Sequence, residues 1–583
     1  MRDSIEIACE TKRTPAVEAA LDILERTIQE RTRTQVTHGT QGMDGGAYRV
    51  ALDIRDGIGA EGFEIETSAD RVSIVGNDER GLLSGVGKFL RASTFGDEGF
   101  VPGAWSGVSV PVKSVRAMYF ATHFHNFYHD APVAEVERYV EELALWGCNA
   151  LSVWFDMHHF DGMDDPRAVA MVERLRTILG AANRVGMGGA LTTLGNEGFA
   201  TSPPALRADW TAGHDGYHRA PGGHYHVEIC PSKPGGLETI LEYRRQVFDA
   251  FADLQMDYVW IWPYDQGGCT CGECAPWGAN GFLEVAEAEA GLIRQYWPSA
   301  KVVFSTWYYD RFVDGEWEGL DKSFSEQKPD WVDVVLADDY AGFPQYPLTH
   351  GIPGGFPAVG FPEISMNKMR PWGGFGANPR PGYWQQHWDR TRDLLDGSFP
   401  YSEGIYEDIN KVLMLQLEWE PDRRASDILR EYAVYEYSPA VADAVVEAIG
   451  MLEDGMDHSV DPDVLETLWE QAAHDESTGD GRSAAGPDAG GLYRLEAATD
   501  SKACLDLLRA ADAELSDYAK RSWRWRILLV RAELDAELTR SGGAVTERSE
   551  ALFGELVCIY RADRAETPVA PPSTSTLKRL AGK

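Results

Sequence analysis

The sequence has few basic residues for its length. Of its 583 residues, 54 are Lys or Arg and 92 are Asp or Glu, and the formal net charge is −38. A surface of this sign repels phosphate groups, so the composition argues against nucleic acid as a partner. The negative charge by itself indicates only a well-solvated surface.

Long apolar runs are absent as well. No stretch reaches the roughly 18 apolar residues that a membrane-spanning helix needs, and the opening segment MRDSIEIACETKRT lacks the apolar core of a secretory signal. We therefore expect a cytoplasmic protein with no membrane partner. The eight cysteines are scattered along the chain, which argues against a disulfide framework. The oligomeric state is open, and a homo-oligomer is compatible with the sequence.

Several common catalytic motifs are missing. The chain contains no GxxxxGK[ST] phosphate loop, GxSxG elbow or HExxH zinc motif, and we expect no organic cofactor. Aromatic residues are plentiful instead, with 18 tryptophans. Their flat faces can build a core, and they can also bind the apolar faces of sugar rings.

The pattern of apolar residues divides the chain into three parts. Residues 1–112 mix strands with amphipathic helices, which predicts an α+β domain, residues 113–412 alternate strands with helices, and residues 413–583 are helical. Eight strand–helix repeats match a (β/α)8 TIM barrel. A doubly wound open sheet is the alternative, but no glycine fingerprint follows the first of these strands. The predicted strands are 116–122, 149–156, 188–194, 257–265, 301–310, 332–340, 358–365 and 397–404.

Polar and aromatic residues follow most of these strands. In such a barrel the carboxyl ends of the strands meet on one face, where the chemistry takes place. Buried carboxylates are costly unless they are paired or used, so several of them converging among Trp and Tyr rings indicate a catalytic site. The residues at the strand ends are His123, His125, Trp154, Asp156, Asn196, Glu197, Asp265, Trp307, Tyr308, Asp310, Asp338, Asp339, Glu363 and Glu403.

Paired carboxylates beside aromatic rings suit cleavage of a glycosidic bond. One carboxyl group must stay protonated to supply the leaving oxygen, and another must stay ionised to act as base or nucleophile. Two other classes of function are open. A non-catalytic carbohydrate-binding protein needs aromatics and amides but no matched acids, and a barrel lyase or isomerase would act on sugars by another route.

Four stretches of the chain resemble known carbohydrate-active enzymes. VSIVGNDERGLLSGVGKFL (72–90) resembles the domain that precedes the barrel in β-N-acetylhexosaminidases and α-glucuronidases. PEISM with PWGGFGANP (362–379), YSEGIYEDINK (401–411) and ILREYAVYEYSP (428–439) resemble an uncharacterised bacterial group related to the α-glucuronidases. The resemblance covers most of residues 60–440. It implies a glycoside hydrolase, α-glucuronidase-like or hexosaminidase-like, that is exo-acting on a small glycoside or oligosaccharide.

The resemblance also implies catalytic roles. Hexosaminidases with substrate-assisted catalysis carry an Asp-Glu pair after the fourth strand, where this chain has Asp265 and Gln266, and an amide cannot protonate a leaving group. The α-glucuronidase pattern instead places the acid at Asp265 and a base or nucleophile among Asp338, Asp339 and Glu363. It favours inversion at the anomeric carbon and leaves retention open.

The contacts with a carbohydrate substrate are predicted from the resemblance and from the strand ends together. Arg116, at the start of the first barrel strand, resembles the sugar-binding Arg of the hexosaminidase barrels. The other predicted contacts are His123, His125, Trp154, Asp156, Trp307, Tyr308, Trp372 and Glu403.

Three cysteines lie within six residues, CTCGEC (269–274), soon after the predicted acid. A tetrahedral structural zinc needs a fourth ligand, and Cys230, in the loop after the third strand, can supply it. We therefore predict a structural zinc bound by Cys230, Cys269, Cys271 and Cys274. Free thiols are the alternative, and a redox site would need a CxxC at a helix start, which this loop does not offer.

Overall fold

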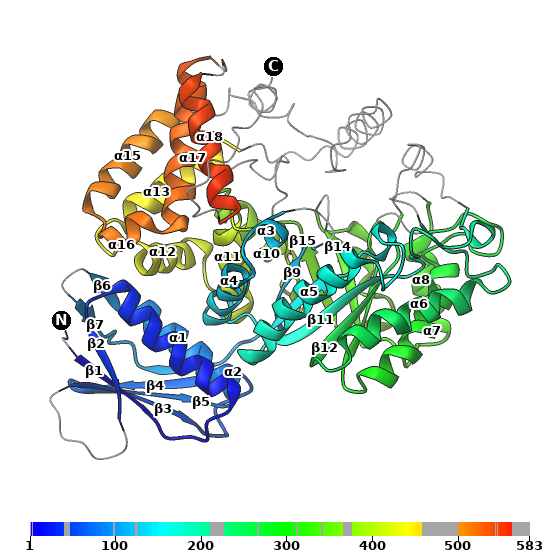
Figure 1. Cartoon of the computed structure of the whole chain (residues 1–583), viewed down its shortest axis with the longest axis horizontal. Coiled ribbons are helices and arrows are strands. Elements are labelled where there is room, and N and C mark those ends of the chain that lie inside the picture. Colours follow the sequence, from blue (N-terminus) through cyan, green and yellow to red (C-terminus); the bar gives the residue numbers. More distant parts are fainter. Residues whose placement is uncertain are drawn as a thin grey trace.

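The computed structural model shows an N-terminal sheet domain, a barrel and a C-terminal helical region (Figure 1). No helix in the part of the chain that it describes is long and apolar enough to cross a membrane. The described residues are 2, 4–39, 47–96, 99–122, 126–209, 227–264, 268–310, 313–339, 342–364, 376–456, 500–542, 544 and 546–562.

The barrel has the eight parallel strand positions that the sequence predicts. Its strands are β9 (Val115–Phe120), β10 (Ala150–Trp154), β11 (Gly188–Leu194), β12 (Met256–Trp262), β13 (Lys301–Ser305), β14 (Val334–Asp339), β15 (Ala358–Pro362), β16 (Gly397–Ser398) and β17 (Tyr401–Ser402). Each strand pairs with the next, and β16 and β17 share the eighth position. Both pair with β9, which also pairs with β10 and so closes the ring.

The barrel strands are apolar along their length because both of their faces are covered, one by the barrel interior and one by helices. The interior is filled by aromatic rings. The ring of Tyr119 stacks on that of Trp260 with 5.5 Å between centroids, and Phe361 lies edge-on 5.2 Å from Tyr119. The barrel is therefore a packed core that is open to ligands only at its ends.

Helices surround this barrel. They are α3 (Phe127–Asp130), α4 (Val133–Leu145), α5 (Pro166–Arg184), α6 (Gly236–Phe251), α7 (Gly281–Tyr296), α8 (Glu316–Glu326), α9 (Gln345–His350), α10 (Pro381–Thr391) and α11 (Asp408–Trp419). α11 continues unbroken through the predicted boundary at residue 412 and contacts β9. The last barrel helix therefore extends to Trp419.

The N-terminal domain contains a six-stranded mixed sheet of order β2-β1-β3-β5-β4-β8 and a separate β6-β7 pair. Its elements are β1 (Ser4–Cys9), α1 (Pro15–Arg31), β2 (Gln35–His38), β3 (Tyr48–Ile54), β4 (Phe63–Thr67), β5 (Arg71–Gly76), α2 (Glu79–Ala92), β6 (Thr94–Gly96), β7 (Gly99–Val101) and β8 (Gly107–Ser109). Thr14 caps the beginning of α1, since its side chain accepts a hydrogen bond from the backbone N–H of Val17.

This domain docks against the amino ends of the barrel strands. Arg80, in the first turn of α2, donates hydrogen bonds to the Gly186 carbonyl oxygen at 2.5 Å and to Asp257 Oδ2 at 2.6 Å. Both acceptors lie at the beginning of a barrel strand. The opposite, carboxyl end of the barrel is therefore left for a ligand.

The C-terminal helices pack on one another and on the carboxyl-end loops of the barrel (Figure 1). They are α12 (Ala425–Glu436), α13 (Ala442–Asp454), α15 (Ser501–Glu514), α16 (Asp517–Arg521), α17 (Trp523–Arg540) and α18 (Glu547–Tyr560). The Tyr560 hydroxyl donates to the Glu403 carbonyl oxygen at 2.6 Å, and Arg531 donates to the Ala377 carbonyl oxygen at 3.3 Å. These helices therefore support the loops after β15 and β17.

Candidate active site

The predicted site lies at the carboxyl ends of the barrel strands. Four of the predicted residues, His123, His125, Asp265 and Trp372, lie outside the described residues, as does Gln266.

An aromatic surface lies at this end of the barrel. The Trp307 ring is 4.6 Å from Tyr308, 5.1 Å from Trp262 and 5.3 Å from Phe361, measured between centroids. Tyr308 has a left-handed backbone, with a φ of 61°, which costs a non-glycine residue about 1–3 kcal/mol. The Asp338 side chain supports this backbone conformation, because its Oδ2 accepts a hydrogen bond from the Tyr308 N–H at 3.0 Å. The predicted neighbours Trp307, Tyr308 and Asp338 therefore come together.

The two consecutive aspartates of β14 point to opposite sides of the strand, as successive strand residues do. Asp338 pairs in register with Phe361, whose ring lies in the barrel interior, so Asp338 shares that face. Asp339 faces helix α10, where His387 Nε2 lies 2.5 Å from its Oδ2. Burial raises the pKa of Asp339, and the neighbouring His387 opposes this rise. The structure thus places Asp338 toward the site and Asp339 behind it.

Two glutamates flank one tyrosine at the ends of β15 and β17. Glu363 follows Phe361 by two residues, is 4% exposed and forms a parallel bridge with Tyr401. The Tyr401 hydroxyl donates to Glu403 Oε1 at 2.6 Å. Burial and the charges of Glu403 and Glu363 raise the pKa of Tyr401 well above its ordinary value, so the phenol stays a donor. Tyr401 was not predicted as a site residue, although it lies two residues before Glu403, which was.

A second cluster lies after β10 and β11. Glu197 Oε1 is 2.6 Å from His158 Nδ1, and Glu197 Oε2 accepts from Trp154 Nε1 at 3.4 Å. Glu228 faces Glu197 in an antiparallel bridge, where the two side chains lie on one face. Burial and the charge of Glu197 raise the pKa of Glu228 well above its ordinary value. His158 and Glu228 were not predicted as site residues, because no sequence motif links them to Glu197 and only the folded chain brings them close to it.

Glu228 should make the protein less stable as the pH rises. Its pKa is higher in the folded chain than in the unfolded chain, so above the ordinary carboxyl range only the folded state keeps the proton. Stability is then lost as the pH rises toward the folded-state pKa. The side chain introduced by Glu228→Gln does not titrate, so urea unfolding of this variant should show a smaller loss of stability between pH 5 and 8. An unchanged loss would contradict this, and Glu238→Gln, at an exposed position on α6, is the matched control.

Arg116 is a correction to the sequence prediction. Its guanidinium lies at the amino end of the barrel, where it donates to the carbonyl oxygens of Gly147 at 3.0 Å and Lys113 at 2.6 Å, and it pairs with Glu61 of the N-terminal domain. The side chain is buried. Arg116 therefore joins two domains and does not contact a substrate at the other end of the barrel.

A buried glutamate that the sequence did not reveal supports the loops after β12 and β13. Glu316 Oε1 accepts from the Tyr264 hydroxyl at 2.5 Å and from the Gly278 N–H at 2.6 Å, and Oε2 accepts from the Asp310 N–H at 3.2 Å. Tyr264 directly precedes the predicted acid in the chain. Asp310, like Tyr308, has a positive φ, of 60°.

Replacing Glu316 by Gln should destabilise the protein by about 1–3 kcal/mol, because the new amide N–H₂ would face the part-buried Asp310 N–H and leave that donor without an acceptor. The free energy of unfolding in urea measures this. Glu318→Gln, an exposed position on the same helix, should change stability by less than about 0.5 kcal/mol. Equal stabilities of the two variants would rule out this role.

Two groups of side chains have the composition of metal sites. Cys230, Cys269, Cys271 and Cys274 come together as predicted, and Asp156, His158 and His159 also lie close to one another. In the second group, His158 Nδ1 bonds to Glu197 and His159 Nδ1 lies 2.8 Å from Asp156 Oδ2. Hydrogen bonding thus explains this group without a metal.

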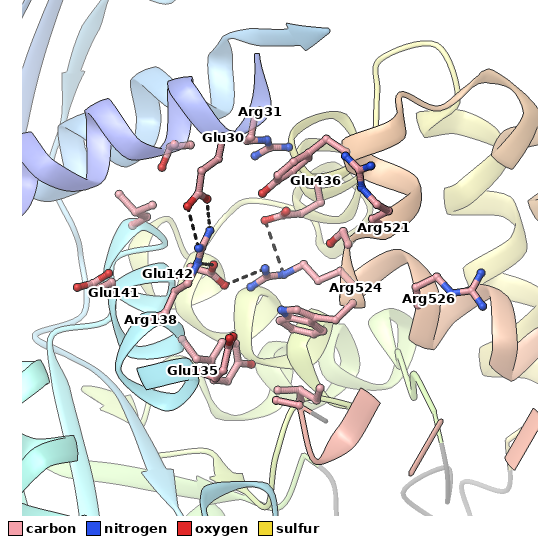
Figure 2. A pocket seen from close by; sticks show the side chains of 18 of the residues that line it. Glu30, Arg31, Glu135, Arg138, Glu141, Glu142, Glu436, Arg521, Arg524 and Arg526 are labelled. Carbon is pink, nitrogen blue, oxygen red and sulfur yellow. Dashed lines mark hydrogen bonds and ion pairs between the residues drawn. The ribbon is translucent and has the colours of Figure 1, made fainter. Parts of the chain in front are cut away.

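The structure also contains a cavity of about 690 Å³ at the junction of the three parts of the chain. Charged residues line it, and they pair across it (Figure 2): Arg138 Nη1 with Glu30 at 3.0 Å, and Arg524 Nη1 with Glu142 Oε2 at 2.9 Å. The residues of these pairs come from different parts of the chain. The cavity is therefore part of a domain junction and lacks the carboxylate arrangement of the barrel end.

Comparisons with known proteins agree on the fold. No protein-family model matches the chain, and no curated protein matches it in sequence. A family GH115 4-O-methyl-α-glucuronidase with specificity for decorated arabinogalactans matches all of this chain with 78% of its own length, at 11% identity and a TM-score of 0.59. A GH138 enzyme that targets the pectin rhamnogalacturonan II matches 96% of this chain with 88% of its own length, at 12% identity and a TM-score of 0.57.

A third structure, the GH89 protein from Clostridium perfringens in complex with its substrate GlcNAc-α-1,4-galactose, matches 93% of this chain with 65% of its own length, at 12% identity and a TM-score of 0.58. All three neighbours are glycoside hydrolases, as the sequence resemblance implied. Identities this low show a shared fold, and function has to be argued from the site.

Proposed function

We propose that the chain is an exo-acting glycoside hydrolase that cleaves a terminal sugar from a small glycoside or oligosaccharide. The observation that carries this is the meeting of Asp338, Glu363 and Glu403 with aromatic rings at the carboxyl end of the barrel. Carboxylates act as acid, base or nucleophile in glycosidic cleavage, and aromatic faces hold sugar rings. The likeness in fold to three glycoside hydrolases supports the same class.

The proposed roles combine the sequence with the geometry. Asp265 is the proposed acid, by its place after β12. The base or nucleophile comes from Asp338, Asp339 and Glu363. Asp338 and Glu363 are favoured because they lie on the strand faces that point into the barrel, whereas Asp339 is bound to His387.

The predicted substrate contacts that the structure describes, apart from Arg116, keep that role in this proposal. Trp307 and Tyr308 offer ring faces, and Trp154, Asp156 and Glu403 offer polar atoms. His123, His125 and Trp372 are proposed from the sequence alone.

A panel of aryl glycosides tests this function. The first substrates are 4-nitrophenyl α-glucuronide, because of the α-glucuronidase-like sequence pattern and the GH115 neighbour, and 4-nitrophenyl N-acetyl-α-glucosaminide, because of the GH89 neighbour. Release of nitrophenol with a free sugar is the expected result. Sugar binding without turnover would support a carbohydrate-binding protein, and an unsaturated or rearranged sugar would support a lyase or isomerase.

We expect the first sugar released to have the inverted anomeric configuration. An inverting site needs room for a water between its two carboxyl groups, with a separation of about 6.5–9.5 Å, whereas retention needs about 5–5.5 Å. Proton NMR during the first minutes of hydrolysis distinguishes the anomers before they equilibrate. Release of the retained anomer would make Glu363 or an aspartate of β14 a nucleophile instead of a base.

A further inference from the structure

The four cysteines of the predicted metal site come from two loops on neighbouring barrel strands. Cys230 lies between β11 and α6, and Cys269, Cys271 and Cys274 lie between β12 and α7. Their Sγ atoms all lie within 4.8 Å of one another, and Cys230 Sγ is 3.8 Å from both Cys271 Sγ and Cys274 Sγ. Sulfurs that are 3.8 Å apart form no disulfide, which needs about 2.05 Å.

This spacing is that of a metal-centred tetrahedron. Four thiolates at a Zn–S distance of about 2.3 Å have sulfurs about 3.8 Å apart. Three of the cysteines are buried, and Cys271 is half-buried. We propose that Cys230, Cys269, Cys271 and Cys274 bind one structural zinc ion.

Backbone N–H groups contact two of the four sulfurs. The Ser232 N–H donates to Cys230 Sγ and the Cys271 N–H donates to Cys269 Sγ, in each case from the residue two positions further along the chain. Such outer hydrogen bonds orient metal ligands and tune them. When zinc binds, the four thiols release their protons to solvent and form four Zn–S bonds, so no position stays open for a catalytic water.

The zinc would hold together the loop after β11, which contains Glu197, and the loop after β12. Asn196 already bridges them, since its amide nitrogen donates to the carbonyl oxygens of Ile229 at 3.2 Å and Gly268 at 3.0 Å, and its Oδ1 accepts from the Gly268 N–H at 3.1 Å. The same two loops carry Glu228 and, by sequence, Asp265. The metal would therefore hold the loops that carry these residues in place and would take no part in bond cleavage. The proposal does not depend on the glycosidase assignment.

Elemental analysis of the full-length protein, purified without chelator, should find one zinc per chain. After zinc removal, reconstitution with cobalt should give the visible absorption of a tetrahedral thiolate site. Removal of zinc should also lower the melting temperature by several degrees, because metal binding contributes to folding. These readouts do not require any enzymatic activity.

Cysteine variants distinguish a zinc site from four thiols that lie close together by chance. Cys271→Ser, at the half-buried position, should fold and lose most of its zinc, and Cys274→Ser should lose both zinc and thermal stability. Cys558→Ser, outside the cluster, should keep one zinc per chain. Well under one zinc in the wild-type protein, iron in its place, or a mass spectrum that shows a disulfide between these cysteines would each overturn the proposal.

Discussion

Replacing Glu363 by Gln should reduce kcat/KM on any glycoside that the wild-type protein cleaves by at least about 10²–10⁴-fold, the usual contribution of an acid or base group. Glu363 is buried beside Tyr401 at the end of β15, on the same strand face as the interior ring of Phe361. The amide has nearly the same shape as the carboxylate but can neither accept a proton nor attack an anomeric carbon, so kcat should fall more than KM rises.

The controls for this prediction come from the same chain. Glu326→Gln removes a carboxylate that is 70% exposed at the end of α8 and should leave kcat/KM unchanged. Asp338→Asn should resemble Glu363→Gln, whereas Asp339→Asn should mainly affect stability, because Asp339 faces His387. Wild-type activity in Glu363→Gln would remove Glu363 from the chemistry, and a loss of kcat confined to Asp339→Asn would reverse the assignment within β14.

Replacing Arg524 by Gln should destabilise the protein by about 3–5 kcal/mol, the cost of breaking a buried ion-pair network by removing one partner. Arg524 is 6% exposed and lies among acids from other helices, with its Nε 2.8 Å from Asp408 Oδ2. Its Nη1 is 2.9 Å from Glu142 Oε2 (Figure 2). Arg524 lowers the pKa of Asp408, whose burial acts in the opposite direction. Without the guanidinium, the buried Asp408 would lose its ion-pair partner, whereas the half-buried Glu142 would keep its pair with Arg138 at 3.3 Å.

Arg526→Gln is the matched control for Arg524→Gln. Arg526 lies two residues further along α17 and pairs with Glu555, but both side chains are more than one third exposed, and such pairs contribute about 0–1 kcal/mol. Urea unfolding followed by far-UV circular dichroism compares the two variants. Equal effects on stability would mean that Arg524 does not hold the C-terminal helices to the barrel.

The barrel was predictable because its strands are apolar on both faces, so each appears as a short apolar run between amphipathic helices. All eight predicted strand positions contain strands in the structure. The strand-end rule also placed Trp307, Tyr308, Asp338 and Glu363 at the same end of the barrel, because the end of a strand can be read from local sequence alone.

The partners of these residues were not predictable, because they come from distant parts of the chain. Arg116 pairs with Glu61 at the amino end of the barrel, and no local pattern indicates that a guanidinium is already engaged there. The choice between Asp338 and Asp339 depends on strand register, since a shift by one residue exchanges their faces. Glu228 meets Glu197 only through an irregular loop pairing.

Hydrolysis in H₂¹⁸O tests the central claim most directly. Wild-type protein, Glu363→Gln and Glu326→Gln are incubated with the aryl glycoside that the panel identifies, and mass spectrometry follows the isotope. The account predicts that wild type and Glu326→Gln release a sugar that carries one ¹⁸O at its anomeric carbon, and that Glu363→Gln releases almost none. Label in the released phenol, or equal release by all three proteins, would contradict it.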